Sequence, residues 1–257
     1  MHTREEKLAA FGRLLDIIDD LRKGCPWDKK QTNDSLRHLT IEEVYELADA
    51  ILENDTENIK KELGDLLLHI VFYAKIGSET GDFDIADVAN AISEKLIYRH
   101  PHIYGDVKVK DEKEVKENWE KLKLKEGKKS VLEGVPKSLP AMVKAMRIQE
   151  KAKGVGFDWD HPDQVWDKVQ EELAEFKAEV AKNDQAKMTE EFGDVLFALI
   201  NYARFLDINP ETALEKTNKK FIKRFQYLEE KAKKEGKDLK NMSLNEMEAY
   251  WNEAKKE

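Results

Sequence analysis

The feature that most constrains the fold of this chain is an internal repeat. Residues 42–75 align without a gap with residues 171–204, at an offset of 129 positions. Many other aligned positions exchange one apolar residue for another, as Leu63 does for Phe192. A gap-free duplication of this length predicts two similar folded units. The residues of the first segment that meet an identical residue in the second are Glu42, Glu43, Glu46, Asn54, Asp55, Glu62, Gly64, Asp65, Leu67, Tyr73 and Ala74.

The similarity continues on both sides of the aligned segment, with small changes in offset. Downstream, a Lys–Arg pair recurs at an offset of 125 and a Trp–Lys pair at an offset of 132. We therefore expect an N-terminal domain over 1–125, a Gly- and Pro-containing linker over 126–140 and a C-terminal domain over 141–257. The outer pairs are Lys95 with Arg99, Lys220 with Arg224, Trp119 with Lys123, Trp251 with Lys255, and, upstream, Trp27-Asp28 with Phe157-Asp158.

Apolar residues recur with helical spacing along nearly the whole chain. The i, i+3, i+4, i+7 pattern of an amphipathic helix is present over 44–51, 63–70 and 192–199. Asn-Asp pairs at 54–55 and 183–184 separate successive helices and supply an N-cap. No alternating strand pattern with hairpin signals is found. The sequence therefore predicts an all-α fold with two tandem homologous helical-bundle domains.

Each half carries two pairs of acids with helical spacing. Residues three apart share one face of a helix, as Glu43 does with Glu46. A single glutamate is more often a solvated surface charge. Apolar residues, however, cover nearly all the rest of the helix expected over 62–74, and a helix that is apolar almost all round is buried. Its acidic stripe should then line a cleft or the bundle interior. The eight acids are Glu43, Glu46, Glu62, Asp65, Glu172, Glu175, Glu191 and Asp194.

These acids indicate a metal site. A short loop makes the two helices of each half antiparallel neighbours, so their carboxylates should meet. Two carboxylates about 5 Å apart repel by about 3 kcal/mol at an effective dielectric constant of about 20, and a divalent cation relieves this repulsion more simply than protonation does. Oxygen ligands without thiolates favour Mg²⁺, with Mn²⁺ as a substitute, over zinc. Such a cluster suits phosphoryl or pyrophosphoryl chemistry.

Cationic pairs recur beside the duplicated acids. Lys95 and Arg99 are one helical turn apart, as are Lys220 and Arg224 at the matching place, and such groups can hold a polyphosphate. A solvated helix face is the alternative for each pair. Trp251 and its counterpart in the first half either cover a base or pack a terminal helix.

Composition excludes several other classes of protein. A net charge of −9 argues against nucleic-acid binding, which needs a basic surface. The single cysteine suits a reducing compartment. No apolar run approaches the roughly 20 residues of a membrane span, and the first residues lack the apolar stretch of a signal peptide. We therefore expect a cytoplasmic protein that binds no membrane.

With E-E-x2-E followed by E-x-G-D in each half, the sequence resembles the MazG family of all-α nucleoside triphosphate pyrophosphohydrolases. The resemblance covers almost the whole chain. It implies Mg²⁺-dependent conversion of nucleoside and deoxynucleoside triphosphates to monophosphates and pyrophosphate, with broad base specificity, in a homodimer with a housekeeping role in the nucleotide pool. Further segments that carry it are Cys25–Asp28, Glu62–Leu67, Arg99–His102, Gly156–Trp159 and Glu191–Asp194.

The resemblance also implies site residues. The eight acids above become metal ligands, and six of them, Glu43, Glu46, Glu62, Asp65, Glu172 and Glu175, become the catalytic set. The N-terminal half departs from the pattern at Phe72, where the other half has Asn201. Expected contacts to the substrate are Lys168, Lys187, Asn201, Lys220, Arg224 and Trp251 in the C-terminal half, and Lys95, Arg99 and Lys123 in the N-terminal half.

We expect Mg²⁺ to bridge the acids and the phosphates and to activate a water for in-line attack, with Glu43 or Glu172 as ligand or base. Either the α or the β phosphorus can be the one attacked. One rival is a di-iron bundle, but it usually needs Glu-x-x-His pairs that are missing from the clusters. The other is a non-catalytic nucleotide-binding regulatory scaffold in which one or both sites are degenerate.

Overall fold

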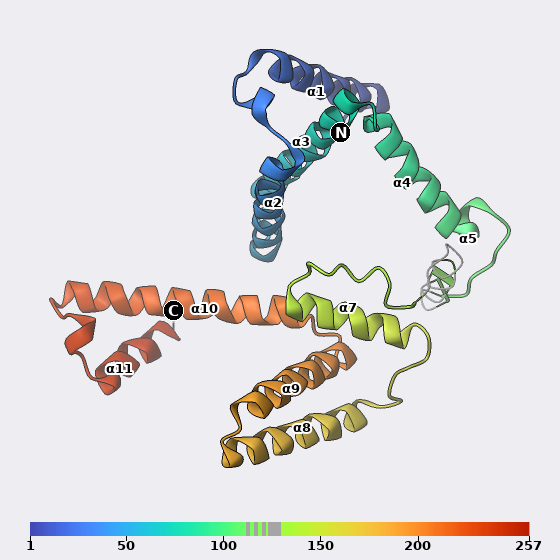
Figure 1. The fold of residues 1–257 in the computed structure, drawn as a ribbon. Helices are drawn as coiled ribbons and strands as arrows, with labels where there is room; N and C mark the ends of the chain where they lie inside the picture. The colour runs from blue at the N-terminus through green and yellow to red at the C-terminus, as the bar shows by residue number, and fades with distance from the viewer. Residues whose placement is uncertain (112–113, 116–117, 120–121, 123–129, 257) are drawn as a thin grey trace. The chain divides into compact units, whose positions relative to one another are not determined.

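The structure is a computed structural model of the 257-residue chain. It describes every residue except 112–113, 116–117, 120–121, 123–129 and 257. Within the described residues the elements are helices joined by loops and turns, with no strand, so the predicted all-α fold is confirmed (Figure 1). None of the described helices is long and apolar enough to cross a membrane.

The chain divides into two compact units, which we name unit 1 (Met1–Val109) and unit 2 (Lys110–Glu257). The borders expected from the repeat, 1–125, 126–140 and 141–257, stay a prediction, and part of the expected linker lies outside the described residues. Each unit is described by itself below.

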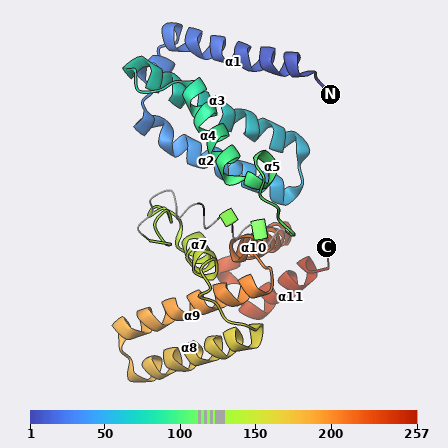
Figure 2. The same ribbon diagram turned by 90° about the vertical axis from the view of Figure 1, so that its right-hand side faces the viewer.

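Unit 1 is built on an antiparallel helical hairpin formed by α2 and α3, and α1 packs against α3 (Figures 1 and 2). Its core lies between α1 and this hairpin, where Ile18, Leu36, Val71 and Phe72 are buried together. The elements are α1 (Arg4–Gly24), the 3-10 helix η1 (Asp28–Lys30), α2 (Asn33–Glu53), α3 (Thr56–Thr80), α4 (Ile85–Arg99) and α5 (Pro101–Tyr104).

Unit 2 repeats the hairpin with α8 and α9, and α7 packs against α9 as α1 does against α3. The long helix α10 follows, and α11 folds back on it around Leu228, Ala232, Met242 and Tyr250 (Figure 1). The elements are α7 (Ala141–Lys153), α8 (Pro162–Lys182), α9 (Gln185–Phe205), α10 (Pro210–Lys234), η2 (Leu239–Asn241) and α11 (Leu244–Ala254).

The same two residues turn the chain in both hairpins. Asn54 and Asn183 end α2 and α8 in the left-handed conformation, each at φ 56°, which asparagine tolerates better than most residues. The next residue caps the following helix: Asp55 accepts from the backbone N–H of Glu57, and Asp184 accepts from that of Lys187. The predicted N-caps are therefore confirmed, and short turns of this kind make the paired helices antiparallel.

The expectation that the helix over 62–74 is buried all round is wrong for the single chain. Leu63 is 53% exposed, and Leu67 and Ile70 on the same face are exposed as well. The matching face of α9 is also exposed at Phe192. A helical wheel reports that a face is apolar, but a hairpin packed by one further helix leaves one apolar face of each helix in water.

Candidate metal centre

The α2–α3 hairpin brings three of the predicted carboxylates of unit 1 together. One carboxylate oxygen from each of Glu43, Glu46 and Glu62 can be chosen so that the three atoms lie within 4.8 Å of one another. The first two side chains come from α2 and the third from α3, because an antiparallel pairing places the middle of one helix opposite the start of the other. Glu62 is only 4% exposed. The predicted meeting of acids from the two helices is thus present in unit 1.

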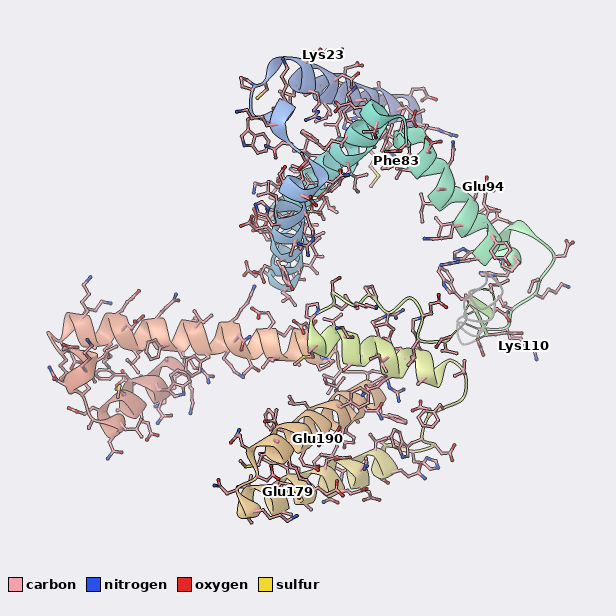
Figure 3. The ribbon with its side chains drawn as sticks, in the orientation of Figure 1. Lys23, Phe83, Glu94, Lys110, Glu179 and Glu190 are labelled. Atoms are coloured by element: carbon pink, nitrogen blue, oxygen red, sulfur yellow. The ribbon has the colours of Figure 1, made fainter. Side chains whose placement is uncertain are left out.

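Unit 2 builds the same arrangement from α8 and α9. Oxygens of Glu172, Glu175 and Glu191 lie within 4.8 Å of one another, and Glu172 is buried. Figure 3 labels two further acids of this hairpin, Glu179 on α8 and Glu190 on α9, neither of which belongs to the triad. The two triads occupy matching positions of the repeat.

Burial and mutual repulsion act on both triads. Burial is the main cause of the raised pKa of Glu43, and the charges of Asp65, Glu46 and Glu62 raise this pKa further. Because Asp65 contributes to this shift, it lies close enough to act on the triad electrostatically although it is not one of its members.

In unit 2, burial and neighbouring negative charges also raise the pKa of one carboxyl group, but this group belongs to a position that is not equivalent to Glu43. The pKa of Glu191 is raised first by burial and then by the charges of Glu175, Asp194 and Glu172. The predicted fourth acid, Asp194, therefore acts on its triad as Asp65 does. Raised pKa values mark carboxylates that lack enough positive charge around them.

One oxygen of the unit 1 triad is buried without a partner. Glu62 Oε1 accepts a hydrogen bond from Lys61 at 3.0 Å, whereas Oε2 has no hydrogen-bond partner. A buried carboxylate oxygen is costly when it is left unpaired, and a divalent cation would satisfy it. Donor type, spacing and this free oxygen therefore all fit a hard, oxygen-binding metal ion.

Different lysines accompany the two triads. In unit 2, Lys168 Nζ lies 2.6 Å from Glu172 and 2.8 Å from Glu171, and these hydrogen bonds raise the pKa of the lysine well above its usual range. In unit 1 the aligned position is Leu39, and the cation is Lys61. Lys168 was expected near the substrate from the family resemblance, whereas the contact between Lys61 and Glu62 was not anticipated.

Comparison with known proteins places this geometry in a family. The model of the MazG nucleotide pyrophosphohydrolase domain matches the chain twice, at residues 31–104 and 161–228. This chain belongs to the MazG family. Each match contains one hairpin with its triad, so the family predicted from the sequence motifs is confirmed, and so is the tandem arrangement of two MazG domains.

Relatives extend over almost the whole of this MazG chain. It is 44% identical to the nucleoside triphosphate pyrophosphohydrolase/pyrophosphatase MazG of Thermotoga maritima, over 95% of both chains. It is 43% identical to the nucleoside triphosphate pyrophosphohydrolase of Escherichia coli K12, over 95% of this chain and 97% of that protein. It is also 51% identical to the Bacillus subtilis protein YabN, over 98% of this chain and 53% of YabN.

Beyond the triad of the second MazG domain, cations expected at the site gather on α10 and α11. Lys220 and Arg224 line a cavity of about 320 Å³, together with three further lysines. Trp251 packs against Phe221 with ring centroids 4.9 Å apart, and the Arg224 guanidinium lies 5.8 Å from its ring centroid. The tryptophan therefore packs α11 on α10 and lies beside the basic cavity. The three further lysines are Lys219, Lys223 and Lys255.

The remaining expected substrate contacts are dispersed. Lys187 is exposed in the first turn of α9, three residues after the N-cap of that helix. Lys95 and Arg99 lie in the last turns of α4. Lys123 lies outside the described residues.

Asn201 is buried in a polar network that the sequence did not reveal. Its Oδ1 accepts from Nε and Nη2 of Arg204, at 3.0 and 2.8 Å. Arg204 also donates from Nη1 to Asp158 at 3.0 Å. The counterpart of Asn201 in unit 1, Phe72, is buried in the core, where the Arg22 guanidinium lies 5.5 Å from its ring centroid. The comparison of the two halves could not reveal the roles of Arg22 and Arg204, because these arginines are not at equivalent positions of the repeat.

His69 on the acidic stripe of unit 1 is buried, and its Nδ1 has no hydrogen-bond partner. Burial lowers its pKa, while the charge of Asp65 acts in the opposite direction. The position is Ala198 in unit 2, so the imidazole is a feature of unit 1.

Proposed function

We propose that this MazG protein hydrolyses nucleoside and deoxynucleoside triphosphates to monophosphates and pyrophosphate, with Mg²⁺ or Mn²⁺ bound at the acid clusters. The observation that carries the proposal is the carboxylate triad, present once in each hairpin, in which one oxygen of each carboxylate lies within 4.8 Å of one oxygen of each of the others. The names of the Thermotoga maritima and Escherichia coli relatives support the same activity. Broad base specificity, a housekeeping role in the nucleotide pool and a cytoplasmic location complete the proposal.

The proposed metal ligands are the three carboxylates of each triad together with the adjacent aspartate. A bound divalent ion supplies charge neutralisation at the phosphates and lowers the pKa of a coordinated water. The proposed set is Glu43, Glu46, Glu62 and Asp65 in unit 1, and Glu172, Glu175, Glu191 and Asp194 in unit 2.

A carboxylate of the triad is proposed to accept the proton of the attacking water. The proposed base is Glu43 in unit 1 and Glu172 in unit 2, each of which is a member of its triad. Water adds to the α or the β phosphorus, the P–O bond that links the α and β phosphates breaks, a proton of the water passes to the glutamate, and the nucleoside monophosphate and pyrophosphate are released.

Cations near the clusters are proposed to hold the substrate. Lys168 already lies at 2.6 Å from Glu172, so a small rotation of its side chain reaches a phosphate bound at the triad. Asn201, two helical turns beyond Asp194, is proposed to act near the nucleoside. The further proposed contacts are Lys187, Lys220, Arg224 and Trp251 in unit 2, and Lys95, Arg99 and Lys123 in unit 1.

A second copy of the chain is proposed to cover the exposed apolar faces of the hairpins. Leu63, Leu67 and Ile70 form such a face on α3, and Phe192 and Leu196 form the matching face on α9. Contiguous apolar surface of this kind marks an interaction site, and duplicated, self-similar faces suit a two-fold homodimer.

Product analysis tests the core of this proposal. ATP is incubated with the protein and MgCl₂, and the products are separated by anion-exchange chromatography. We expect AMP and pyrophosphate, and we expect EDTA to abolish both. ADP with orthophosphate would contradict the proposed reaction, and unchanged turnover in EDTA would contradict the metal.

A further inference from the structure

The two helices of the α2–α3 hairpin face each other in a fixed register. Near the turn, Glu46 of α2 meets Glu62 of α3 in the triad. Ten residues further from the turn along both helices, Leu36 meets Phe72 in the core of unit 1. Antiparallel helices that meet at both places also face each other between them, because both rise by the same distance per residue. The residues opposite each other in this stretch can therefore be counted from the acids.

One such pair lies seven residues from the acids that meet near the turn, and it differs between the units. In unit 1 the pair is Leu39 with His69, and in unit 2 the same count gives Lys168 with Ala198. Each unit thus has one side chain with an N–H group at this place, on the second helix of the hairpin in unit 1 and on the first helix in unit 2. The residue opposite is apolar in both units. We name these two residues of each unit the donor pair.

His69 lies beside the acids of unit 1 with a ring nitrogen unpaired. The residue is 7% exposed, and its Nδ1 is buried without a hydrogen-bond partner. It lies one helical turn beyond Asp65 on the same face of α3, and the charge of this aspartate acts on the imidazole. A buried polar atom is costly when it is left unpaired. His69 is not a member of the triad, so a metal ion held by the triad alone would leave this nitrogen without a partner.

Lys168 shows which kind of ligand suits the donor pair. Its Nζ lies 2.6 Å from Glu172, one helical turn away on α8, so it reaches the acids from the same distance along the hairpin as His69 does in unit 1. In the proposed function this lysine binds a phosphate. An imidazole carries at least one N–H in either protonation state and can donate to the same kind of oxygen, whereas the side chain of Leu39 cannot.

We propose that His69 donates a hydrogen bond to a phosphate oxygen of a triphosphate bound with metal at the acid cluster of unit 1, in the place that Lys168 has in unit 2. The inference rests on the proposed function and adds to it a substrate-binding residue. It also gives unit 1 a phosphate site of its own, although the lysine is missing there.

The test exchanges the donor pair of unit 1 for that of unit 2. Unit 2 is first disabled by Glu175→Gln combined with Lys168→Met, and binding of inorganic tripolyphosphate with MgCl₂ is measured by calorimetry. We expect this background to bind one equivalent per chain. His69→Ala should weaken the binding about tenfold, because a hydrogen bond to a charged group is lost. Adding Leu39→Lys should restore at least the affinity of the background, because it recreates the lysine–alanine pair of unit 2.

Two controls separate a contact to phosphate from a contact to the metal. Binding of Mn²⁺ without phosphate, followed by electron paramagnetic resonance, should be the same in the background and after His69→Ala. In a chain that carries Glu46→Gln, where the site of unit 2 is left intact, His69→Ala should leave the affinity for tripolyphosphate unchanged.

Three results would overturn the inference. The first is that the background binds no tripolyphosphate although the wild-type chain does, and the second is that His69→Ala binds it as tightly as the background. The third is a loss that Leu39→Lys does not restore or that extends to Mn²⁺, since the imidazole would then support the fold or the metal. Failure of the wild-type chain to bind tripolyphosphate with Mg²⁺ would instead contradict the proposed function, so the two failures are distinguishable.

Discussion

At the scale of single residues, one substitution in each triad allows the contribution of each unit to the activity to be measured separately. We expect Glu46→Gln and Glu175→Gln each to abolish metal-dependent turnover in its own unit, because each removes a charged ligand from a triad within 4.8 Å. If both units are active, each variant keeps part of the wild-type rate and the double variant keeps none. Steady-state rates with ATP and MgCl₂ provide the measurement.

Matched controls for these variants lie on the same hairpins. Glu57 and Glu190 are exposed and belong to neither triad, so Glu57→Gln and Glu190→Gln should retain the wild-type rate. A wild-type rate in the double variant of Glu46 and Glu175 would show that the clusters do not carry the reaction.

Lys168, which forms an ion pair with Glu172 in the triad of unit 2, gives a second prediction. Lys168→Met removes the cation at 2.6 Å from Glu172 and leaves that buried carboxylate less neutralised. We expect KM for ATP in unit 2 to rise about tenfold, since a charge-assisted contact to a phosphate is lost. The assay is run in the Glu46→Gln background, so that unit 2 alone is measured. Leu39→Ala in unit 1, the aligned position, should leave this KM unchanged.

The ion pair between Arg22 and Glu79 in unit 1 predicts a pH dependence of stability. The hydrogen bond from Arg22 is the main cause of the lowered pKa of Glu79. A carboxyl whose folded pKa is lowered stabilises the fold above its ordinary pKa of 4.5, and this stabilisation is lost as the pH falls through the lowered value. We expect Glu79→Gln to reduce Tm at pH 7 and to have a smaller effect at pH 3.

This prediction is checked by thermal unfolding followed by circular dichroism. Glu79→Gln is compared with Glu57→Gln, whose side chain is exposed and lies at the opposite end of α3. An equal fall of Tm at both pH values would contradict the assigned role of the ion pair.

At the scale of elements, each hairpin depends on its turn. Asp55→Ala removes the acceptor for the N–H groups of Glu57 and Asn58, and we expect it to lower the free energy of unfolding by about 1 kcal/mol. Urea unfolding gives the measurement. Asp106→Ala, in an exposed loop, is the control and should change this free energy by less than about 0.5 kcal/mol.

Much of each hairpin could be predicted from the sequence because its signals are local. The Asn-Asp turns, the apolar periodicity and the spacing of Glu43 with Glu46 all lie within a few residues of each other. Once two helices pair in antiparallel fashion, the meeting of these acids with Glu62 follows from helix geometry.

What the sequence could not supply depends on contacts between distant residues. The bond from Arg204 to Asp158 joins residues that are 46 positions apart, and nothing in the local pattern distinguishes Arg204 from a solvated arginine. The exposure of Leu63 was missed for a related reason: a helical wheel shows which face is apolar but not whether a neighbour covers it.

At the scale of the whole molecule, the exposed apolar faces predict self-association. We expect light scattering coupled to size-exclusion chromatography to give a mass of twice 29.8 kDa. Ile70→Asp combined with Phe192→Asp places charges on both faces and should shift the protein to the monomer while its helical circular dichroism is retained. A monomeric wild-type chain would contradict the proposed dimer.

The arginine that holds the loop before the hairpin comes from a different helix in each unit: Arg22 comes from α1, and Arg204 comes from α9. This difference has a consequence for recombination between the two halves of the gene. A recombinant that joined α7 to the α2–α3 hairpin would contain neither Arg22 nor Arg204, whereas one that joined α1 to α8–α9 would contain both. The first product would lose the bonds that fix its loop, and the second would bury a surplus positive charge. We therefore expect an exchange of these segments between the two halves to lower the stability of the product.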